Sequence, residues 1–325
     1  MSEWCVGCAR YIFCPPLVNS VTRQLINSMK VAFLGLGAIG APMARHLAPH
    51  YDLFVWNRTA SRAGAFARDN KATATSTPAE AVRDAAVVIT CLPTSREVES
   101  LLDGPDGMFD ALASGSTLID CTSGDPATSR RIAARIAERS VGFVDAPVSG
   151  GVSGATKGIL TIMCGGDEAT MARARPILEA FGEKIVLCGP VGAGHAVKAV
   201  NQAMLGIHIW SLAEGLVALQ KAGVATDTAL DVINSSSGRS NTSMNLFPER
   251  VMTRAFPRTF KLALMDKDVR IAADFAREHG VTSPLLQLAS ELLREARRQL
   301  GEEADHVETV QVLEKWAGVE VGRKS

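Results

Sequence analysis

The sequence predicts an α/β protein in which an N-terminal doubly wound sheet is followed by an all-α C-terminal domain. From Lys30 to about Gly189, short apolar runs alternate with helical segments, the pattern of a largely parallel sheet that helices cover on both faces. After Gly194 the strand pattern disappears, and only the helical spacing of apolar residues remains. The chain has 325 residues, of which 47% are apolar and 21% charged, and is long enough for two globular domains.

The first predicted strand, Lys30–Leu34, leads directly into a glycine-rich turn. Residues 38–47 continue from the turn with helical spacing, and a second apolar strand follows at 53–56. A G-x-G-x-x-G motif in this strand–turn–helix–strand context is the fingerprint of a Rossmann-type dinucleotide-binding domain. The pyrophosphate would lie on the turn and at the helix N-terminus, where backbone N–H groups are free. The candidate residues for this contact are Gly35, Leu36, Gly37, Ala38, Ile39 and Gly40.

The residues after the second strand indicate which dinucleotide binds. Asn57, Arg58 and Thr59 stand where the fingerprint expects the adenosine ribose. A carboxylate there would accept hydrogen bonds from the ribose and repel a 2′-phosphate. The guanidinium of Arg58 attracts a phosphate instead, and Asn57 and Thr59 can donate hydrogen bonds to it. An exposed arginine after a strand is also common in proteins without this role. We expect NADP as the cofactor, with NAD as the alternative.

Further strands and helices follow in order. We expect strands at 86–92, 117–121, 142–146, 160–164 and 185–188, and helices at 78–84, 96–102, 126–139 and 168–181. Residues 195–221 then form one long apolar helix. Ser283-Pro284 and Gly301 bound a later helix, and Asp305 with Glu308 forms a capping box before the final helix, which Gly318 can end. The predicted domains are residues 29–191, which bind the cofactor, and 192–325, which serve the substrate and oligomerisation.

Residues 1–28 precede the first strand and show no clear periodicity. They lack the apolar core of a secretory signal, and their helical amphipathicity is poor for a mitochondrial transit peptide. We expect a loosely ordered extension, with folding beginning at Met29. Cys5, Cys8 and Cys14 lack a fourth ligand or a histidine pair, so we expect no metal site and a reduced, cytoplasmic compartment.

The overall charge limits the classes of partner. The net charge of +0 gives no electrostatic argument for binding nucleic acid or an anionic membrane. No apolar run approaches the roughly 18–20 residues that a membrane helix needs. We therefore expect a small-molecule substrate and neither nucleic acid nor a membrane as a partner.

Three further clusters carry polar groups suited to chemistry. Ser149-Gly150-Gly151 offers a hydroxyl and unhindered backbone N–H groups, as either a small anion nest or a flexible loop. Lys198 and Asn201 lie on one face of the long helix, as i and i+3. A lysine in an apolar helix usually snorkels to the surface, but its pairing with Asn201 near the domain junction favours a cleft. Lys267-Asp268, just before a helix, is by itself more often a solvated surface pair.

The fingerprint and these three clusters, in this order, resemble the β-hydroxyacid dehydrogenase family from about Lys30 to Gly318. The resemblance is carried by the segments GLGAIGAPMA, DAPVSGG and GAGHAVKAVNQ and by the Lys-Asp pair. It implies that Lys198 is the catalytic acid/base and that Asn201 assists it. It also implies that the substrate carboxylate binds to Ser149, Gly150 and Gly151.

The resemblance implies further contacts. Lys267 would line the nicotinamide end of the cofactor site, and Phe260 and Asp268 would line the closed active site. Family members carry a Ser-Thr pair after the strand near Asp120. Here the pair is Thr122-Ser123, so both hydroxyls are present in inverted order and are expected to contact the substrate. We also expect cofactor contacts from Leu92, Pro93 and Thr94.

Two types of substrate stay open. Residues 234–240, Asn-Ser-Ser-Ser-Gly-Arg-Ser, are similar to a segment of 3-hydroxyisobutyrate dehydrogenases, whereas Asn-Arg-Thr is more typical of NADPH-dependent semialdehyde reductases. We predict a 3-hydroxyisobutyrate dehydrogenase-type enzyme, with a tartronate semialdehyde, succinic semialdehyde or glyoxylate reductase as the alternative. Phosphogluconate dehydrogenases typically have histidine where Asn201 stands, and non-catalytic, protein-binding relatives have lost the lysine. Apolar helices such as 285–293 predict a homodimer or homotetramer.

Overall fold

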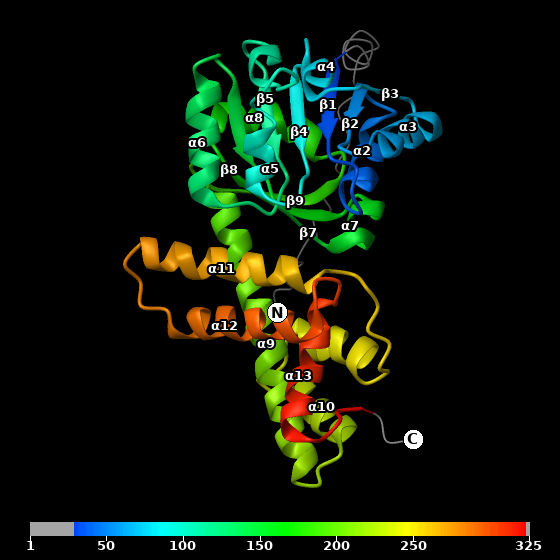
Figure 1. The fold of residues 1–325 in the computed structure, drawn as a ribbon, viewed down its shortest axis with the longest axis vertical. Coiled ribbons are helices and arrows are strands. Elements are labelled where there is room, and N and C mark those ends of the chain that lie inside the picture. The colour runs from blue at the N-terminus through cyan, green and yellow to red at the C-terminus, as the bar shows by residue number, and fades with distance from the viewer. Residues whose placement is uncertain (1–28, 323–325) are drawn as a thin grey trace, which may run out of the picture.

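The computed structural model describes residues 29–322, so the N-terminal extension and its cysteines lie outside the described residues. A sheet with its helices forms one end of the molecule and a bundle of helices forms the other (Figure 1). The long helix α9 (Ala193–Lys221) starts at the sheet and runs through the helical end. The predicted fold class, an α/β sheet region followed by helices, is confirmed.

The sheet is mixed rather than wholly parallel. Its order is β3-β2-β1-β4-β5-β6-β8-β7, with β9 paired to β8. The strands from β3 to β6 are parallel, whereas β8 runs antiparallel to β6 and β7. The strand bounds are β1 Lys30–Leu34, β2 Asp52–Trp56, β3 Ala72–Ala74, β4 Val87–Thr90, β5 Thr117–Asp120, β6 Gly142–Asp145, β7 Val148–Ser149, β8 Leu160–Gly165 and β9 Gly182–Gly189.

The reversal at β8 corrects the expectation of simple parallel alternation. β6 and β7 behave as one strand interrupted at Pro147, because Asp145 pairs with Gly165 and Val148 pairs with Ile162 in the same register. The chain then returns through α7 (Gly151–Lys157), which has only 7 residues. A parallel crossover needs about a dozen residues or more, so this short connection brings β8 back antiparallel.

Helices cover both faces of the sheet, as predicted. Alternate residues of β1 enter two different cores: Val31 and Phe33 pack with α2, α3 and α8, while Ala32 and Leu34 pack with α4, α5 and α6. The strand is therefore apolar from Val31 to Leu34, as strands buried on both faces are. The helix bounds are α2 Gly40–Leu47, α3 Ala60–Asp69, α4 Pro78–Val82, α5 Ser95–Ser100, α6 Pro126–Ala137 and α8 Glu168–Leu178, and the short 3₁₀ turn η1 spans Phe109–Ala111.

Beyond β9, the described chain forms helices and no further strand. These are α10 Thr226–Asn234, the π-helix η2 Thr242–Val251, α11 Leu262–Glu278, α12 Pro284–Leu300, the 3₁₀ turn η3 His306–Thr309 and α13 Val310–Ala317. α11 and α12 both pack against α9 (Figure 1).

The helix ends follow the sequence signals with one exception. Asp305 and Glu308 form the predicted capping box, and Gly318 ends α13 in the left-handed region at φ +65°. Pro284 begins α12 as expected, and Gly301 ends it. The hydroxyl of Ser283, however, does not cap α12; it is buried and has no hydrogen-bond partner among residues 29–322.

α9 is more apolar than the sequence analysis allowed. It contains an 18-residue window with a mean hydropathy of 1.3, so by length and composition alone it could cross a membrane. In the structure 44% of that window is buried, and residues along the helix belong to both cores of the helical region. The composition of α9 therefore fits a central helix on which other helices pack.

Asp305 connects the capping box to the segment that leads into α11. Its carboxylate accepts hydrogen bonds from the backbone N–H groups of Thr259 (2.8 Å), Phe260 (2.9 Å) and Val307 (3.2 Å). Burial alone would raise the pKa of Asp305, but the hydrogen bond and charge of His306 and these N–H groups hold it well below its usual range. The folded structure therefore favours the ionised form.

We expect Asp305→Asn to be less stable than the wild type at pH 7 by about 2 kcal/mol, the order of magnitude of hydrogen bonds to a charged acceptor. Because the folded pKa is depressed, this stabilisation is present above the unfolded pKa of about 3.9 and is lost as the pH falls further. Urea unfolding across this range should show the two free energies converging in acid. Glu303→Gln, at an exposed ion pair with Lys261, is the control and should change little. A difference independent of pH would contradict the assignment.

Candidate active site

The carboxylate of Asp145, at the end of β6, holds the first turn of α9. It accepts hydrogen bonds from the backbone N–H groups of Gly192 (2.6 Å) and His195 (2.8 Å). The helix approaches the sheet so closely that a Cβ on Gly194 would lie 2.2 Å from the carbonyl oxygen of Met163. Desolvation raises the pKa of Asp145, and the nearby His195 and the two N–H groups offset only part of this effect. This contact places Lys198 at the edge where the parallel strands end.

Lys198 is buried rather than snorkelling to the surface. Its residue is only 7% exposed, and Nζ donates a hydrogen bond to Oε1 of Gln202 at 3.0 Å. Nδ2 of Asn201 donates to the same oxygen at 3.2 Å. Asn201 is therefore linked to the lysine through Gln202, a residue that the sequence analysis did not single out. In the sequence, the i, i+4 spacing of Lys198 and Gln202 was the signal that could have indicated this hydrogen bond.

The surroundings of Lys198 lower the pKa of its ammonium group. Desolvation lowers the pKa of Lys198, Asp268 acts to raise it, and Lys267 lowers it further. A lysine with a lowered pKa can accept as well as donate a proton nearer to neutral pH.

Lys267 and Asp268 form a largely buried pair within α11, in contrast to the solvated surface pair that such neighbours by themselves more often form. Nζ of Lys267 lies 2.9 Å from Oδ1 of Asp268, and the two side chains are 12% and 3% exposed. The same ammonium donates to the carbonyl oxygens of Ser123 and Pro93. Oδ2 of Asp268 is buried and has no hydrogen-bond partner within the described part of the chain. Lys267 thus links α11 to two loops at the sheet edge.

Those two loops, after β4 and β5, are also tied to each other. The hydroxyl of Thr122 accepts a hydrogen bond from the backbone N–H of Leu92 at 3.1 Å. Because Thr122 is buried and its hydroxyl is used within the protein, the half-buried Ser123 is the better placed of the inverted pair to meet a ligand. The hydroxyl of Thr94 is likewise engaged, by the carboxylate of Glu97.

The glycine fingerprint has the predicted geometry. Gly35 has φ +108°, and a Cβ on Gly40 would lie 2.0 Å from the carbonyl oxygen of Gly35. A Cβ on Gly37 would meet nothing within 4 Å, so this position is open to a ligand. Ala38 and Ile39 form the turn into α2.

The side chain of Asn57 is hydrogen-bonded to the fingerprint turn and to its own loop. Its Oδ1 accepts from the backbone N–H of Leu36 at 3.0 Å, and its Nδ2 donates to the carbonyl oxygen of Thr59 at 3.1 Å. Arg58 is exposed and has no hydrogen-bond or ion-pair partner among the described residues. Of the three residues, Arg58 is therefore the most available to a phosphate.

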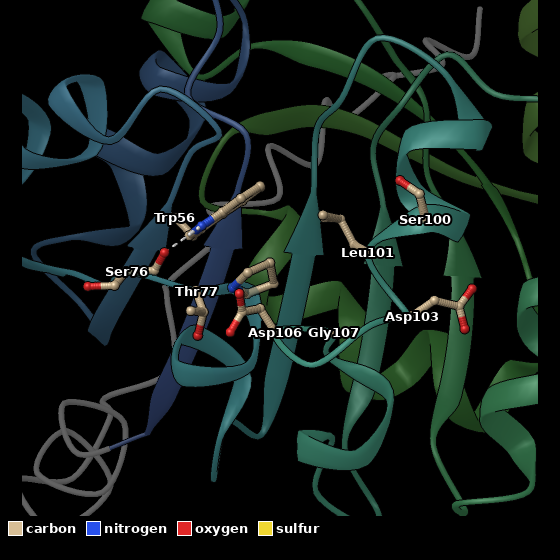
Figure 2. A pocket seen from close by; sticks show the side chains of 9 residues that line it. Trp56, Ser76, Thr77, Ser100, Leu101, Asp103, Asp106 and Gly107 are labelled. Carbon is tan, nitrogen blue, oxygen red and sulfur yellow. Dashed lines mark hydrogen bonds between the residues drawn. The ribbon is translucent and has the colours of Figure 1, made fainter.

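A pocket of about 270 Å³ lies beside this segment (Figure 2). Trp56 forms one wall and donates from Nε1 to the carbonyl oxygen of Ser76 at 3.3 Å. The pocket could not be expected from the sequence, because its walls come from separate segments. They are Trp56, Ser76, Thr77, Pro78, Ser100, Leu101, Asp103, Asp106 and Gly107.

The predicted carboxylate-binding loop lies at the junction of β7 and α7, at the edge of the sheet that faces the helices (Figure 1). Gly150 and Gly151 have φ +132° and +62°, and a Cβ on Gly151 would meet nothing within 4 Å. Within residues 29–322, no hydrogen bond joins this loop to Lys198. Phe260 lies before α11, edge-on to His306 with 5.5 Å between ring centroids. No group of His, Cys, Asp and Glu in the described chain is arranged to hold a metal ion.

Comparison with known protein families matches almost the whole described chain. The NAD binding domain of 6-phosphogluconate dehydrogenase matches residues 30–189. The NAD-binding domain of NADP-dependent 3-hydroxyisobutyrate dehydrogenase matches residues 192–313. A solved structure of Mycobacterium tuberculosis 3-hydroxyisobutyrate dehydrogenase with L-serine is 31% identical, with a TM-score of 0.81 over 88% of this chain and 99% of that one. Psf3 in complex with NADP⁺ is 26% identical, with a TM-score of 0.76 over 87% and 99%.

Curated relatives are similar over nearly their full length. 2-(Hydroxymethyl)glutarate dehydrogenase of Eubacterium barkeri is 35% identical over 302 residues, 91% of this chain and 98% of that protein. 2-Hydroxy-3-oxopropionate reductase of Escherichia coli is 32% identical over 290 residues, 89% and 98% of the two chains. The chain therefore belongs to the β-hydroxyacid dehydrogenase family, NAD(P)-dependent oxidoreductases that act on CH–OH groups.

Proposed function

We propose that this enzyme prefers NADP and interconverts a small β-hydroxyacid and its semialdehyde, as 3-hydroxyisobutyrate dehydrogenases do. The observation that carries the proposal is the buried ammonium of Lys198, held at the sheet edge beside Lys267 and Asp268. A tartronate or succinic semialdehyde reductase or a glyoxylate reductase is the second candidate, supported by the Asn57-Arg58-Thr59 segment and by the similarity to 2-hydroxy-3-oxopropionate reductase. Turnover of a panel of these acids and aldehydes with NADPH would separate the two.

The residues around the fingerprint fit a bound dinucleotide. Gly37 leaves room for a pyrophosphate, and Arg58 is free to pair with a 2′-phosphate. The pocket beside Trp56 would take the adenine, since it adjoins the residues proposed for the ribose phosphate. Leu92, Pro93 and Thr94 would lie along the nicotinamide end, with Lys267 beside them. When bound, the nicotinamide supplies or accepts the hydride.

The remaining residues would bind and protonate the substrate. Ser149, Gly150 and Gly151 would hold its carboxylate through a hydroxyl and backbone N–H groups, with Thr122, Ser123, Phe260 and Asp268 lining the site. Nζ of Lys198 would stabilise the developing alkoxide and donate a proton to it. In the oxidative direction the neutral amine would accept the hydroxyl proton. Asn201 would act through Gln202, whose Oε1 accepts hydrogen bonds from both Asn201 and Lys198.

Domain limits, assembly and compartment are proposed with the function. Residues 29–191 would form the cofactor domain and 192–325 the helical domain, with residues 1–28 outside both. Leu285 and Leu288 on α12 are 65% and 56% exposed, which supports a homodimer or homotetramer in which they are covered. We propose action in the cytoplasm. Light scattering would give the oligomeric state, and expression of residues 29–325 would test the domain limits.

Arg58→Ala should weaken NADPH binding by about ten- to a hundredfold, because a hydrogen bond to a charged group contributes roughly 1.5–3 kcal/mol. NADH binding should change little, since NADH lacks the 2′-phosphate. Fluorescence titration of both nucleotides measures this difference. Arg68→Ala, at the far end of α3, is the matched control. Equal affinity of the wild type for NADH and NADPH would contradict the preference.

Gly151→Ala should raise the Michaelis constant for the acid by roughly tenfold or more, because its methyl group enters the open space proposed for the carboxylate. NADPH affinity should stay near the wild-type value. Gly115→Ala is the control, since Gly115 also has positive φ and open space but lies before β5, at the opposite edge of the sheet. If both variants raise the Michaelis constant alike, the carboxylate site lies elsewhere.

Lys198→Ala should lower turnover at least about a hundredfold while NADPH still binds, because general acid–base catalysis typically contributes about 10²–10⁴-fold. Lys198→Arg should also fail, since a guanidinium is a poor proton donor near neutral pH. In wild-type enzyme, the pH profile of oxidation should show a group that ionises below the ordinary lysine range. Lys184→Ala, on exposed β9, is the control. Near-normal turnover in Lys198→Ala would mean that another group moves the proton.

A further inference from the structure

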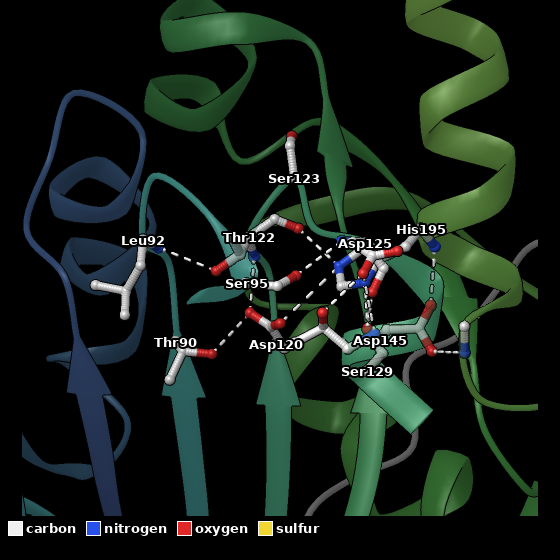
Figure 3. Close-up of polar contacts among 12 residues, drawn as sticks. Thr90, Leu92, Ser95, Asp120, Thr122, Ser123, Asp125, Ser129, Asp145 and His195 are labelled. Atoms are coloured by element: carbon white, nitrogen blue, oxygen red, sulfur yellow. Dashed lines mark hydrogen bonds and ion pairs between the residues drawn. The ribbon is translucent and has the colours of Figure 1, made fainter. Parts of the chain in front are cut away.

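A second buried titratable side chain, His195, stands one turn before Lys198 on α9. The residue is 0% exposed. Its Nε2 lies 2.8 Å from the carbonyl oxygen of Thr122, and its Nδ1 lies 2.7 Å from Oγ of Ser129 on α6 (Figure 3). The ring thus joins the helix that carries Lys198 to the loop after β5 and to α6.

The hydrogen-bond partners define the tautomer of the neutral ring. The carbonyl oxygen of Thr122 can only accept, so Nε2 carries the hydrogen and donates it. Nδ1 then accepts from the hydroxyl of Ser129. That hydroxyl also donates to the carbonyl oxygen of Asp125 at 3.0 Å, so its one hydrogen is shared between this oxygen and Nδ1 at 2.7 Å. Ser129 therefore orients the imidazole, because the hydrogen bond made by one ring nitrogen sets the role of the other.

The loop after β5 packs directly on the ring. A Cβ on Gly124 would lie 2.7 Å from Cε1 of His195 and 2.3 Å from Oγ of Ser95. The same serine oxygen accepts from the backbone N–H of Asp125 at 2.7 Å, which ties the loop to the start of α5 (Figure 3). At Gly124 the loop is therefore in close contact with the ring of His195.

The loop is also held by Lys267, which donates to the carbonyl oxygen of Ser123. Adjacent carbonyl groups of Thr122 and Ser123 are thus bound by His195 from α9 and by Lys267 from α11. Through its hydroxyl, Thr122 also accepts from Leu92, so the loop after β4 shares the same support. The two helices that carry the lysines of the site are both fastened to the loops proposed to hold substrate and cofactor.

We propose that His195 is a positioning residue, which sets the distance between the Lys198 ammonium and the Thr122-Ser123 loop through its Nε2–H bond. The inference rests on the proposed function, because it assigns the loop and the lysine to one reaction. Asp145 anchors the backbone of α9, and His195 fixes the helix relative to the ligand-binding loop. Displacement of a reacting group by about 1 Å can cost roughly a hundredfold in rate, so a single bond at this point affects turnover.

The test compares His195→Leu with His195→Gln. Leucine removes the donor and leaves a buried carbonyl without a partner, and turnover should fall about ten- to a hundredfold with NADPH affinity nearly unchanged. Glutamine places an N–H where Nε2 stands and should restore most of the turnover. Thr117→Val is the matched control. It removes a buried hydroxyl that bonds Arg173 at the other end of β5, so it should lower the melting temperature without lowering turnover.

Ser129→Ala keeps the test decisive if His195→Leu does not fold. This variant removes the partner of Nδ1, and it should lower turnover by a smaller factor and weaken the Nε2–H signature in ¹⁵N spectra of the ring. Wild-type turnover in His195→Leu, or a glutamine variant as slow as the folded leucine variant, would overturn the inference. A wild type inactive on every hydroxyacid and semialdehyde tested would instead overturn the proposed function. The ¹⁵N spectra would then still decide whether Nε2 carries the hydrogen.

Discussion

The hydrogen bonds between Asp145 and the first turn of α9 are the contact on which the rest of the molecule depends. A carboxylate at the end of a strand meets the N–H groups at the start of a 29-residue helix, where the helix dipole favours negative charge. Since α9 is also the helix on which α11 and α12 pack, this contact orients the whole helical region relative to the sheet. It brings residues 50 positions apart in sequence into direct contact.

Such a contact exists only because the surrounding packing removes water. Asp145, Lys198 and Asp268 are all nearly inaccessible, and isolated charges in such places would be strongly unfavourable. Each is therefore partnered: Asp145 by backbone N–H groups, Lys198 by Gln202 and Asp268 by Lys267. The same burial shifts the pKa of Lys198 downward and makes the site suited to proton transfer. Burial at the junction thus underlies both the pairing of these charged groups and the lowered pKa of Lys198.

Patterns of a few residues determined the fold class and much of the proposed site. The apolar alternation before Gly189 and its absence afterwards predicted the sheet and the helices, because buried strands and helices have different periods. The G-x-G-x-x-G turn and the Asp305–Glu308 capping box were predictable because each depends on backbone conformation within one turn. The expectation that Lys198 and Lys267 serve one active site came from the resemblance of the whole chain to a family.

Only the tertiary structure decided which side chains meet. The reversal of β8 depends on where a seven-residue helix can return the chain, which the strand pattern does not encode. The side chain of Asn57 accepts a hydrogen bond from the backbone N–H of Leu36. Gln202 accepts hydrogen bonds from both Asn201 and Lys198. The ion pair of Lys267 and Asp268 is largely buried. His195 binds a loop 73 residues away in sequence. Sequence spacing describes neighbours along one element, whereas the partner of a long polar side chain depends on which elements pack around it and exclude water.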